Sequence, residues 1–384
     1  MRIAHISDVH LGYRAYSRVD RHGRNQRESD VLLAFKRVLK QALDNEPDLI
    51  LITGDLFHTV RPSNTSLLGA YTYFSEAQGR REGAPMLVIA GNHETPRTIE
   101  SGCILEILKH IPGVTVVYNT IQAVVIESLG LHALCIPSRG VPEIEKHMLE
   151  PDPKAKVNLL LLHGILEGTA PFALERPIER KRIVREEWDY IALGDYHLHQ
   201  QVAPNAYYAG ATEFTSTNIW EEAGKEKGFI LYDTEVRTAQ FIPIRTRRVI
   251  DLLPIDAQDL TIQELNKAIE SRANSEGFDG AIVRQRVYNL LPDQRSGIDG
   301  DLIRELRTRA LHYQLDLRAP RAGGRPSLGT GHEDEETGET RLTLQDEWRQ
   351  FAGQYTISPD IRRNEMIELG IHYLDRVGAE VEST

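Results

Sequence analysis

Five short apolar runs mark the first half of the chain, and polar residues follow each run at once. The runs cover residues 3–6, 49–52, 86–90, 157–162 and 190–193. Near-continuous apolar segments of this length are typical of strands that are buried on both faces of a parallel sheet. Ligands gather just beyond the carboxyl ends of such strands. We therefore expect the five polar clusters to meet at one site.

Helical periodicity lies between the apolar runs. Residues 30–43 and residues 63–74 each predict a helix, so strand-like and helical segments alternate up to about residue 244. This alternation is typical of α/β layers. Two later apolar runs, 229–232 and 239–244, predict antiparallel strands that complete a sandwich. The first domain is accordingly expected to span residues 1–245.

A second, smaller domain is expected over residues 246–319. Its predicted elements are a strand at 249–253, a helix at 261–273, a strand at 281–287, a helix at 299–313 and a strand at 314–317. This order predicts a small α+β domain.

The remaining part of the chain changes in composition and then recovers helical spacing. Residues 320–342 are rich in Gly, Pro and acidic residues, which predicts a flexible linker. Residues 343–384 form the expected helical segment, with apolar residues at Ile367, Ile371 and Leu374. A helix of this kind either docks on a partner or packs back on its own domain, and the sequence leaves both open.

Composition narrows the classes of protein that fit. No stretch of about 18 apolar residues occurs, so a cytoplasmic protein without a membrane segment is expected. A net charge of −11 argues against non-specific coating of nucleic acid. Basic stretches at 180–182 and 245–248 leave nucleic acid open as a substrate. The two cysteines, Cys103 and Cys135, have apolar neighbours and are expected to be core residues.

The polar clusters carry residue types that bind metal ions. In chain order they are Asp8-Val9-His10, Gly54-Asp55, Gly91-Asn92-His93-Glu94, His163-Gly164 and Gly194-Asp195-Tyr196-His197. Mixed oxygen and nitrogen donors suit manganese, iron or zinc better than calcium. The candidate ligands are Asp8, His10, Asp55, Asn92, His163, Asp195 and His197. Seven ligands are too many for one such ion, but they fit two ions that share the carboxylate of Asp55.

A pair of divalent ions is suited to hydrolysis of a phosphoester. The ions bind the phosphate, lower the pKa of a bridging water and stabilise the leaving oxygen. His93 lies next to a candidate ligand, so it can protonate the leaving oxygen, with a pKa that Glu94 or the metals adjust. In isolation the same histidine would be read as an ordinary hydrogen-bonded residue.

The order and the glycine contexts of the five clusters resemble the signature of the calcineurin-like metallophosphoesterases. Further residues narrow the resemblance to the SbcD-like nuclease subunits of double-strand-break repair complexes. These residues are Arg27, Asp30, the run 54–58 and Arg61-Pro62-Ser63. The resemblance implies a four-layer α-β-β-α sandwich with a small α+β capping domain and a helical C-terminal tail.

The resemblance also implies a role for each site residue. Asp8, His10, Asp55 and His197 would hold one metal, and Asp55, Asn92, His163 and Asp195 would hold the other. His93 would be the catalytic acid, and His58 would place the DNA strand for exonucleolytic cutting. The expected cofactors are two manganese ions. The expected partners are DNA, an SbcC-type ATPase bound by the C-terminal helices, and a second copy of the chain.

The chain departs from the family pattern at Asp195, where the first histidine of the last motif usually stands. An aspartate can still bind a metal, and its register after Gly194 is unchanged. His199 is an alternative ligand if the loop shifts. Two other functions remain open on the sequence, namely a phosphodiesterase or phosphatase for small molecules, and a scaffold that keeps the fold without turnover.

Overall fold

The structure is a computed structural model. It describes residues 1–96, 98, 102–169, 177–275, 277–320, 348–349, 352–353 and 363–382. The chain divides into two compact units, Met1–Arg321 and Ala322–Thr384, and each is described by itself. The predicted division of the first unit at residues 245 and 246 stays a prediction.

The first sheet contains three of the five predicted strands. Its six strands are β1 (Arg2–Ile6), β2 (Leu49–Thr53), β3 (Met86–Ile89), β4 (Val114–Val117), β11 (Gly228–Asp233) and β12 (Thr238–Pro243). They lie in the order β12-β11-β1-β2-β3-β4. Strands β1 to β4 run parallel, and β11 pairs antiparallel with both β1 and β12. The antiparallel pair predicted at the end of the sandwich is therefore present.

The second sheet contains the other two predicted strands. Its six strands are β5 (Gln122–Ile126), β6 (Leu131–Ile136), β7 (Val157–His163), β8 (Tyr190–Gly194), β9 (Gln200–Ala203) and β10 (Ala206–Tyr208). They lie in the order β5-β6-β7-β8-β10-β9, and β6, β7, β8 and β10 run parallel. The sequence pattern did not indicate β4, β5, β6, β9 or β10.

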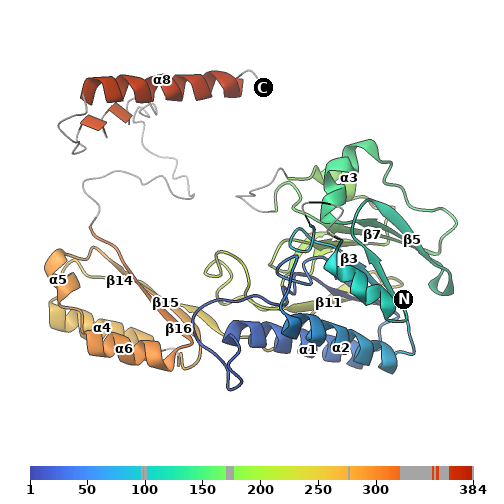
Figure 1. Ribbon diagram of the computed structural model, residues 1–384, viewed down its shortest axis with the longest axis horizontal. Coiled ribbons are helices and arrows are strands. Elements are labelled where there is room, and N and C mark those ends of the chain that lie inside the picture. The colour runs from blue at the N-terminus through green and yellow to red at the C-terminus, as the bar shows by residue number, and fades with distance from the viewer. Residues whose placement is uncertain are drawn as a thin grey trace. The chain divides into compact units, whose positions relative to one another are not determined.

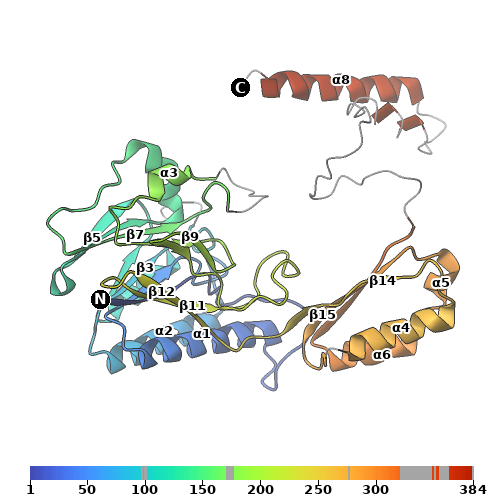
Figure 2. The same cartoon turned by 180° about the vertical axis from the view of Figure 1, so that it is seen from behind.

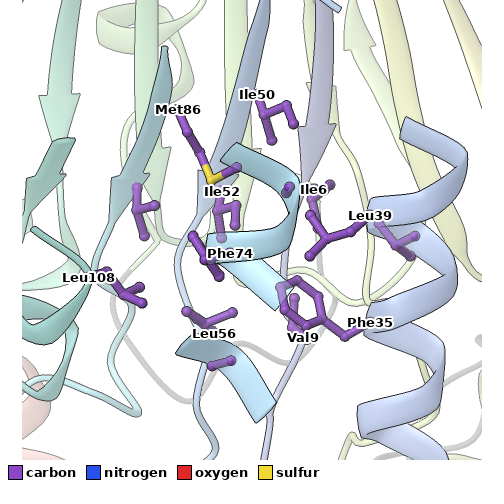
Figure 3. Packing of buried hydrophobic residues seen from close by; sticks show 14 of the residues in the cluster. Ile6, Val9, Phe35, Leu39, Ile50, Ile52, Leu56, Phe74, Met86 and Leu108 are labelled. Carbon is purple, nitrogen blue, oxygen red and sulfur yellow. The ribbon is translucent and has the colours of Figure 1, made fainter. Parts of the chain in front are cut away.

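Helices cover the outer face of the first sheet. Helices α1 (Gln26–Asp44) and α2 (Asn64–Arg80) lie along it (Figure 1), and α1 begins where the Asn25 side chain accepts hydrogen bonds from the amides of Arg27 and Glu28. Ile6 and Ile52 of the sheet pack against Phe35 and Phe74 of these helices (Figure 3).

Two further apolar layers complete the sandwich. Ile3 and Leu51 of the first sheet pack between the sheets against Leu161 of the second. On the outer face of the second sheet, Leu162 packs in a cluster with Trp188 and with residues of α3 (Arg180–Ile183) and of the 3-10 helix η4 (Ser138–Lys146). The predicted α-β-β-α sandwich is confirmed. Two more 3-10 helices, η2 (Ile104–His110) and η3 (Glu127–Leu129), lie in its connections.

A third, smaller sheet follows the sandwich. It contains β13 (Val249–Asp251), β14 (Ile255–Asp256), β15 (Ile282–Tyr288) and β16 (His312–Leu317). Every pair in it is parallel: β15 pairs with β13 and β14 along one edge and with β16 along the other. Helices α4 (Ile262–Asn274) and α6 (Gly300–Arg309) lie side by side on one face (Figures 1 and 2), and α5 (Pro292–Ser296) precedes α6.

Two details of this sheet differ from the expectation. All of its strand pairs are parallel because helices carry the chain between its later strands, which is an α/β arrangement rather than an α+β one. The helix expected at 299–313 ends at Arg309, and the next strand begins at His312 rather than at residue 314. Both the Leu311 and His312 amides donate to the Ala281 carbonyl, so the chain leaves the helix to join the sheet.

The second unit contains helix α8 (Arg363–Glu382). The Trp348 indole donates to the Ile367 carbonyl at 3.0 Å, and Arg363 donates to the Gly353 carbonyl at 2.8 Å, so the described residues before α8 pack on it. Ile371 is buried, whereas residues 321–342 of the expected linker and the side chain of Leu374 lie outside the described residues. Within the described part of the chain, no helix is long and apolar enough to cross a membrane.

Candidate metal centre

The two sheets bring all five polar clusters to one place. Clusters at the carboxyl ends of β1 and β2 are joined by backbone hydrogen bonds, from Asp8 to the Gly54 carbonyl at 3.2 Å and from His10 to the Asp55 carbonyl at 2.8 Å. The cluster after β8 joins them, because the Asp195 amide donates to the Asp8 carboxylate at 3.1 Å. The expectation that the clusters meet is correct.

The backbone at these positions adopts a conformation that ordinary residues avoid. Four residues have positive φ: Asp8 (50°), His10 (55°), Asp55 (50°) and Asp195 (88°). Such residues cost stability and gather at functional sites. Two glycines allow the close approach that the clusters need. A Cβ at Gly91 would lie 2.1 Å from Asp55 Oδ1, and one at Gly54 would lie 2.1 Å from His163 Nδ1.

Asp55 stands between two imidazoles. Its Oδ2 lies 3.6 Å from His10 Nε2, and its Oδ1 lies 3.6 Å from His163 Nε2. These distances are too long for hydrogen bonds. The two oxygens of one buried carboxylate thus face two separate nitrogen donors, which is the arrangement that a bridging ligand requires.

The hydrogen bonds of His163 fix which nitrogen is free. Its Nδ1 lies 2.7 Å from the Thr53 carbonyl, which can only accept, so Nδ1 carries the proton. Its Nε2 is buried, has no hydrogen-bond partner among the described residues, and lies 3.6 Å from Asp195 Oδ1. In the neutral ring this lone pair faces two carboxylates. A cation at that point would remove the repulsion.

A second donor group forms around His10. Ligand atoms of Asp8, His10 and His197 all lie within 4.8 Å of one another, and the Nε2 atoms of the two imidazoles are 3.0 Å apart. Two nitrogens that bind one cation at about 2.1 Å each would be separated by about 3 Å. The donor atoms therefore fit a divalent metal ion.

The electrostatics of the site agree with this fit. Burial raises the pKa of Asp8 to about 6 and that of Asp55 to about 7, and the neighbouring His163 offsets only part of this increase. Burial also opposes charge on His163, but Asp55, Asp195 and Asp8 outweigh it and raise its pKa to about 9. Burial and the neighbouring imidazoles, His197 first among them, hold the pKa of His10 well below its usual range. A bound cation would satisfy both kinds of group.

His93 and His58 lie beside the second donor group. The Nδ1 atom of His93 donates to the His58 carbonyl at 2.8 Å, and the two rings stack with centroids 4.9 Å apart. The Nε2 atom of His93 lies 3.9 Å from Asp55 Oδ2, and its side chain is 36% exposed. Burial and the neighbouring His93 lower the pKa of His58 to about 4. The structure thus brings both histidines next to His10.

Asn92 and Asp195 line a small cavity with His163. The cavity has a volume of about 30 Å³, and its other lining residues are Ser138, Val141, Gly164, Ile165 and Ile178. His199 is oriented elsewhere, because its Nδ1 donates to the Tyr208 carbonyl at 3.1 Å and its ring stacks on Phe241 at 4.4 Å. The geometry favours Asp195 over His199 as a donor beside His163.

Two buried carboxylates that support the site were not singled out as such from the sequence. Glu94 accepts hydrogen bonds from the amides of Phe57 at 2.9 Å and Gly91 at 3.1 Å, so it ties the second cluster to the third. Burial, with the nearby Asp55, raises the pKa of Glu94 to about 8. Glu222 lies 3.7 Å from His197 Nδ1 and was not noticed, because it lies in a segment without periodic pattern.

A sandwich of two sheets with carboxylate and imidazole donors at the strand ends defines a metallophosphoesterase. The chain belongs to the calcineurin-like phosphoesterase family, whose model matches residues 1–199. Membership in this family implies divalent metal ions, which the His and Asp groups of the site can hold.

Similar proteins carry a more specific name. The chain is 28% identical over 300 residues to the DNA double-strand break repair protein Mre11 of Methanocaldococcus jannaschii, which covers 74% of this chain and 77% of that protein. The Mre11 proteins of Methanopyrus kandleri (27% identity, 67% of this chain and 60% of that protein) and Archaeoglobus fulgidus (26%, 72% and 67%) are also similar. The resemblance to archaeal counterparts of SbcD is confirmed by these relatives.

Proposed function

We propose that the chain is a metal-dependent DNA nuclease that hydrolyses phosphodiester bonds in double-strand-break repair. Similarity to proteins named for this process covers 74% and 72% of the chain in two of the relatives, which is more than the matched family domain alone. The observation that carries the proposal is the position of Asp55, whose two oxygens face nitrogen donors on opposite sides.

The proposed ligands form two sets that share Asp55. Asp8, His10, Asp55 and His197 form one set, and Asp55, Asn92, His163 and Asp195 form the other. Manganese suits these mixed oxygen and nitrogen donors. Two such ions would bind the scissile phosphate and activate the attacking water. Asp195 adds a negative charge to the set that contains His163, so we expect it to change which metal that set prefers.

His93 is the proposed general acid. Its Nδ1 is held by the His58 carbonyl, so the ring presents the partly exposed Nε2 toward the site. A proton on Nε2 can pass to the leaving oxygen of the broken phosphodiester. His58 stacks on His93 and has its other edge against Tyr13, at a centroid distance of 5.0 Å. From this position we propose that His58 helps to place the DNA strand.

Cleavage assays test the proposal directly. Labelled linear duplex DNA, circular single-stranded DNA and a small chromogenic phosphodiester would be incubated with the full chain, with and without manganese. We expect manganese-dependent cleavage of both DNAs. The variant His93→Gln should lose about 10²- to 10⁴-fold of that activity because it removes the proton donor. His110→Gln serves as the control, since His110 is an exposed histidine outside the site.

Each other outcome contradicts the proposed substrate, the proposed turnover or the proposed role of His93. Cleavage of the small phosphodiester without cleavage of either DNA would indicate a phosphodiesterase for small molecules. Absence of any metal-dependent hydrolysis would indicate a scaffold. Full activity of His93→Gln would exclude His93 as the acid while leaving the nuclease itself standing.

The proposed partners are DNA, an SbcC-type ATPase and a second copy of the chain. Helix α8 supports the ATPase as partner, because Leu369 is 55% exposed and Tyr373 is 57% exposed. Exposed apolar side chains on a helix are suited to binding in a groove of another protein. The homodimer rests on the family resemblance.

A further inference from the structure

A buried ion pair lies behind the metal centre. Glu222 and Lys227 belong to the segment between β10 and β11, their side chains are 6% and 1% exposed, and Lys227 Nζ donates to Glu222 Oε2 at 2.6 Å. Removing two charges from water is expensive, and well-packed apolar residues are often at least as stabilising. Stability alone therefore does not account for charged residues at these two positions.

The pair contacts His197 at two points. Lys227 Nζ donates to the His197 carbonyl at 2.8 Å, and Glu222 Oε1 lies 3.7 Å from His197 Nδ1. That Nδ1 is buried and has no hydrogen-bond partner in the part of the chain that the structure places. Glu222 is thus the carboxylate nearest to the nitrogen of His197 that faces away from His10.

The proton of the neutral His197 ring can sit on either nitrogen. If it sits on Nε2, the nitrogen 3.0 Å from His10 Nε2 has no lone pair to offer a metal ion. A carboxylate beside Nδ1 favours the proton there and leaves Nε2 free, which is how carboxylates commonly support histidine ligands.

We propose that Glu222 is a positioning residue for His197. Its carboxylate, whose Oε1 lies 3.7 Å from Nδ1, attracts the ring proton to Nδ1 by its charge and so leaves Nε2 free for a metal ion, while Lys227 holds both the carboxylate and the His197 backbone in place. The inference rests on the proposed function in one respect, since it takes His197 to be a metal ligand.

Binding of Mn²⁺ to the full chain tests the inference without any activity assay. Calorimetric titration of the metal-free protein would compare wild type with Glu222→Gln. We expect the affinity for at least one Mn²⁺ to fall by about 10- to 100-fold, as for other supporting carboxylates. Glu226→Gln is the matched control, because Glu226 is an exposed glutamate in the same segment, and its affinity should equal that of wild type.

A double variant separates positioning from a merely structural role. Glu222→Leu with Lys227→Met removes both charges together, so no charge is left buried without a partner, and the fold should persist. We expect its urea midpoint to stay near that of wild type while its Mn²⁺ affinity falls as in Glu222→Gln. Wild-type affinity in the folded double variant would overturn the inference.

The tautomer of His197 provides a second readout. Nitrogen NMR of the imidazoles should show the proton on Nδ1 in the metal-free wild type and a shift toward Nε2 in Glu222→Gln. A proton on Nε2 in wild type would overturn the inference whether or not the variants fold. If wild type itself binds no Mn²⁺, the metal centre of the proposed function fails instead.

Discussion

His5 is enclosed between the two sheets, and both of its nitrogens have partners. Its Nδ1 lies 2.8 Å from the Tyr190 hydroxyl, and its Nε2 lies 2.9 Å from Thr53 Oγ1. Burial lowers the pKa of His5 to about 3, with a smaller contribution from His199. Unlike His163 and His197, this imidazole offers no free nitrogen, so it is part of the core rather than of the metal centre.

The pKa of His5 makes stability depend on pH. The folded-state pKa lies below the unfolded value of about 6.5, so the unfolded chain binds the additional proton between these values. The contribution of His5 to stability is therefore fully present above pH 6.5 and is lost as the pH falls toward 3. In urea unfolding of the metal-free protein, His5→Gln should reduce the slope of free energy against pH by up to about 1.4 kcal/mol per unit below pH 6.

The exposed His22 supplies the control for this measurement. His22→Gln should leave the slope unchanged, and the other buried histidines contribute equally to all three proteins. An identical slope in wild type and His5→Gln would show that His5 is not held neutral by the fold.

At the scale of residues, a site residue could be predicted from the sequence only if it lies close after an apolar run. Asp8, Asp55 and His163 each follow such a run within three residues, so their convergence could be predicted from strand order alone. Glu222 follows no run and reaches His197 only through the path of the chain between β10 and β11. A contact of that kind depends on tertiary structure, and no local pattern indicates it.

At the scale of elements, an ion network joins helix α1 to the segment that leads into the third sheet. Arg27 in the first turn of α1 is fully buried and donates to Asp30 at 3.0 Å and to the Phe214 carbonyl at 2.7 Å. Asp30 also accepts from Arg247 at 2.9 Å, and Arg247 lies two residues before the start of β13. One carboxylate thus connects the sandwich to the smaller sheet.

Removal of Arg27 should be costly because its partners would remain buried. We expect Arg27→Met to lower the free energy of unfolding by about 3–5 kcal/mol, since Asp30 and Glu213 would each lose a partner. Arg21→Ala, at an exposed position, should change it by less than about 0.5 kcal/mol. Urea denaturation of the metal-free chain measures both. A loss below about 1 kcal/mol for Arg27→Met would contradict this account of the network.

Elements with strong periodicity were predictable, and those with mixed signals were not. The predicted helix at 299–313 is too long, because Ala310, Leu311 and Tyr313 continue an apolar pattern that also suits a strand. Strand β5 gives no clear signal because four of its five residues are exposed or half-buried at the edge of its sheet. Arg27 was singled out only by the family resemblance, and the contacts of Arg27 with Glu213 and of Asp30 with Arg247 have no signal in the sequence pattern.

At the scale of the whole molecule, metal binding and folding are coupled. A ligand that binds only the folded state stabilises it, by about 2.7 kcal/mol per site at a concentration one hundred times its dissociation constant. Mn²⁺ should therefore raise the urea midpoint of wild type, and a chelator should reverse the increase. Asp55→Asn should abolish most of it, because both proposed ligand sets share Asp55, whereas Asp195→Ala should retain the part that comes from the proposed set around His10.

The stabilities of wild type and Asp55→Asn can also be compared in the metal-free protein. Asp55→Asn removes a buried charge whose pKa is already raised, so without metal this variant should be at least as stable as wild type. A variant that is strongly destabilised without metal, or that keeps the full stabilisation by Mn²⁺, would contradict the bridging role of Asp55.

The architecture of the whole molecule was only partly accessible from the sequence. Apolar runs indicated α/β layers. The family resemblance, and not the periodicity, predicted that two sheets pack face to face with helices on both outer sides. The parallel order of the third sheet does not follow from the sequence pattern, which indicates the strand near β13 but not β14, a strand of only two residues at Ile255–Asp256.

The positive φ values at Asp8, His10, Asp55 and Asp195 have a consequence for how this chain responds to selection. Glycine or asparagine would adopt these conformations at lower cost, so laboratory evolution toward heat resistance in the absence of metal would favour them at these positions. Such a population would become more robust and lose the proposed metal ligands together. Selection for stability and selection for metal binding thus act in opposite directions at these four positions. Only a screen that demands both properties would keep the present residues.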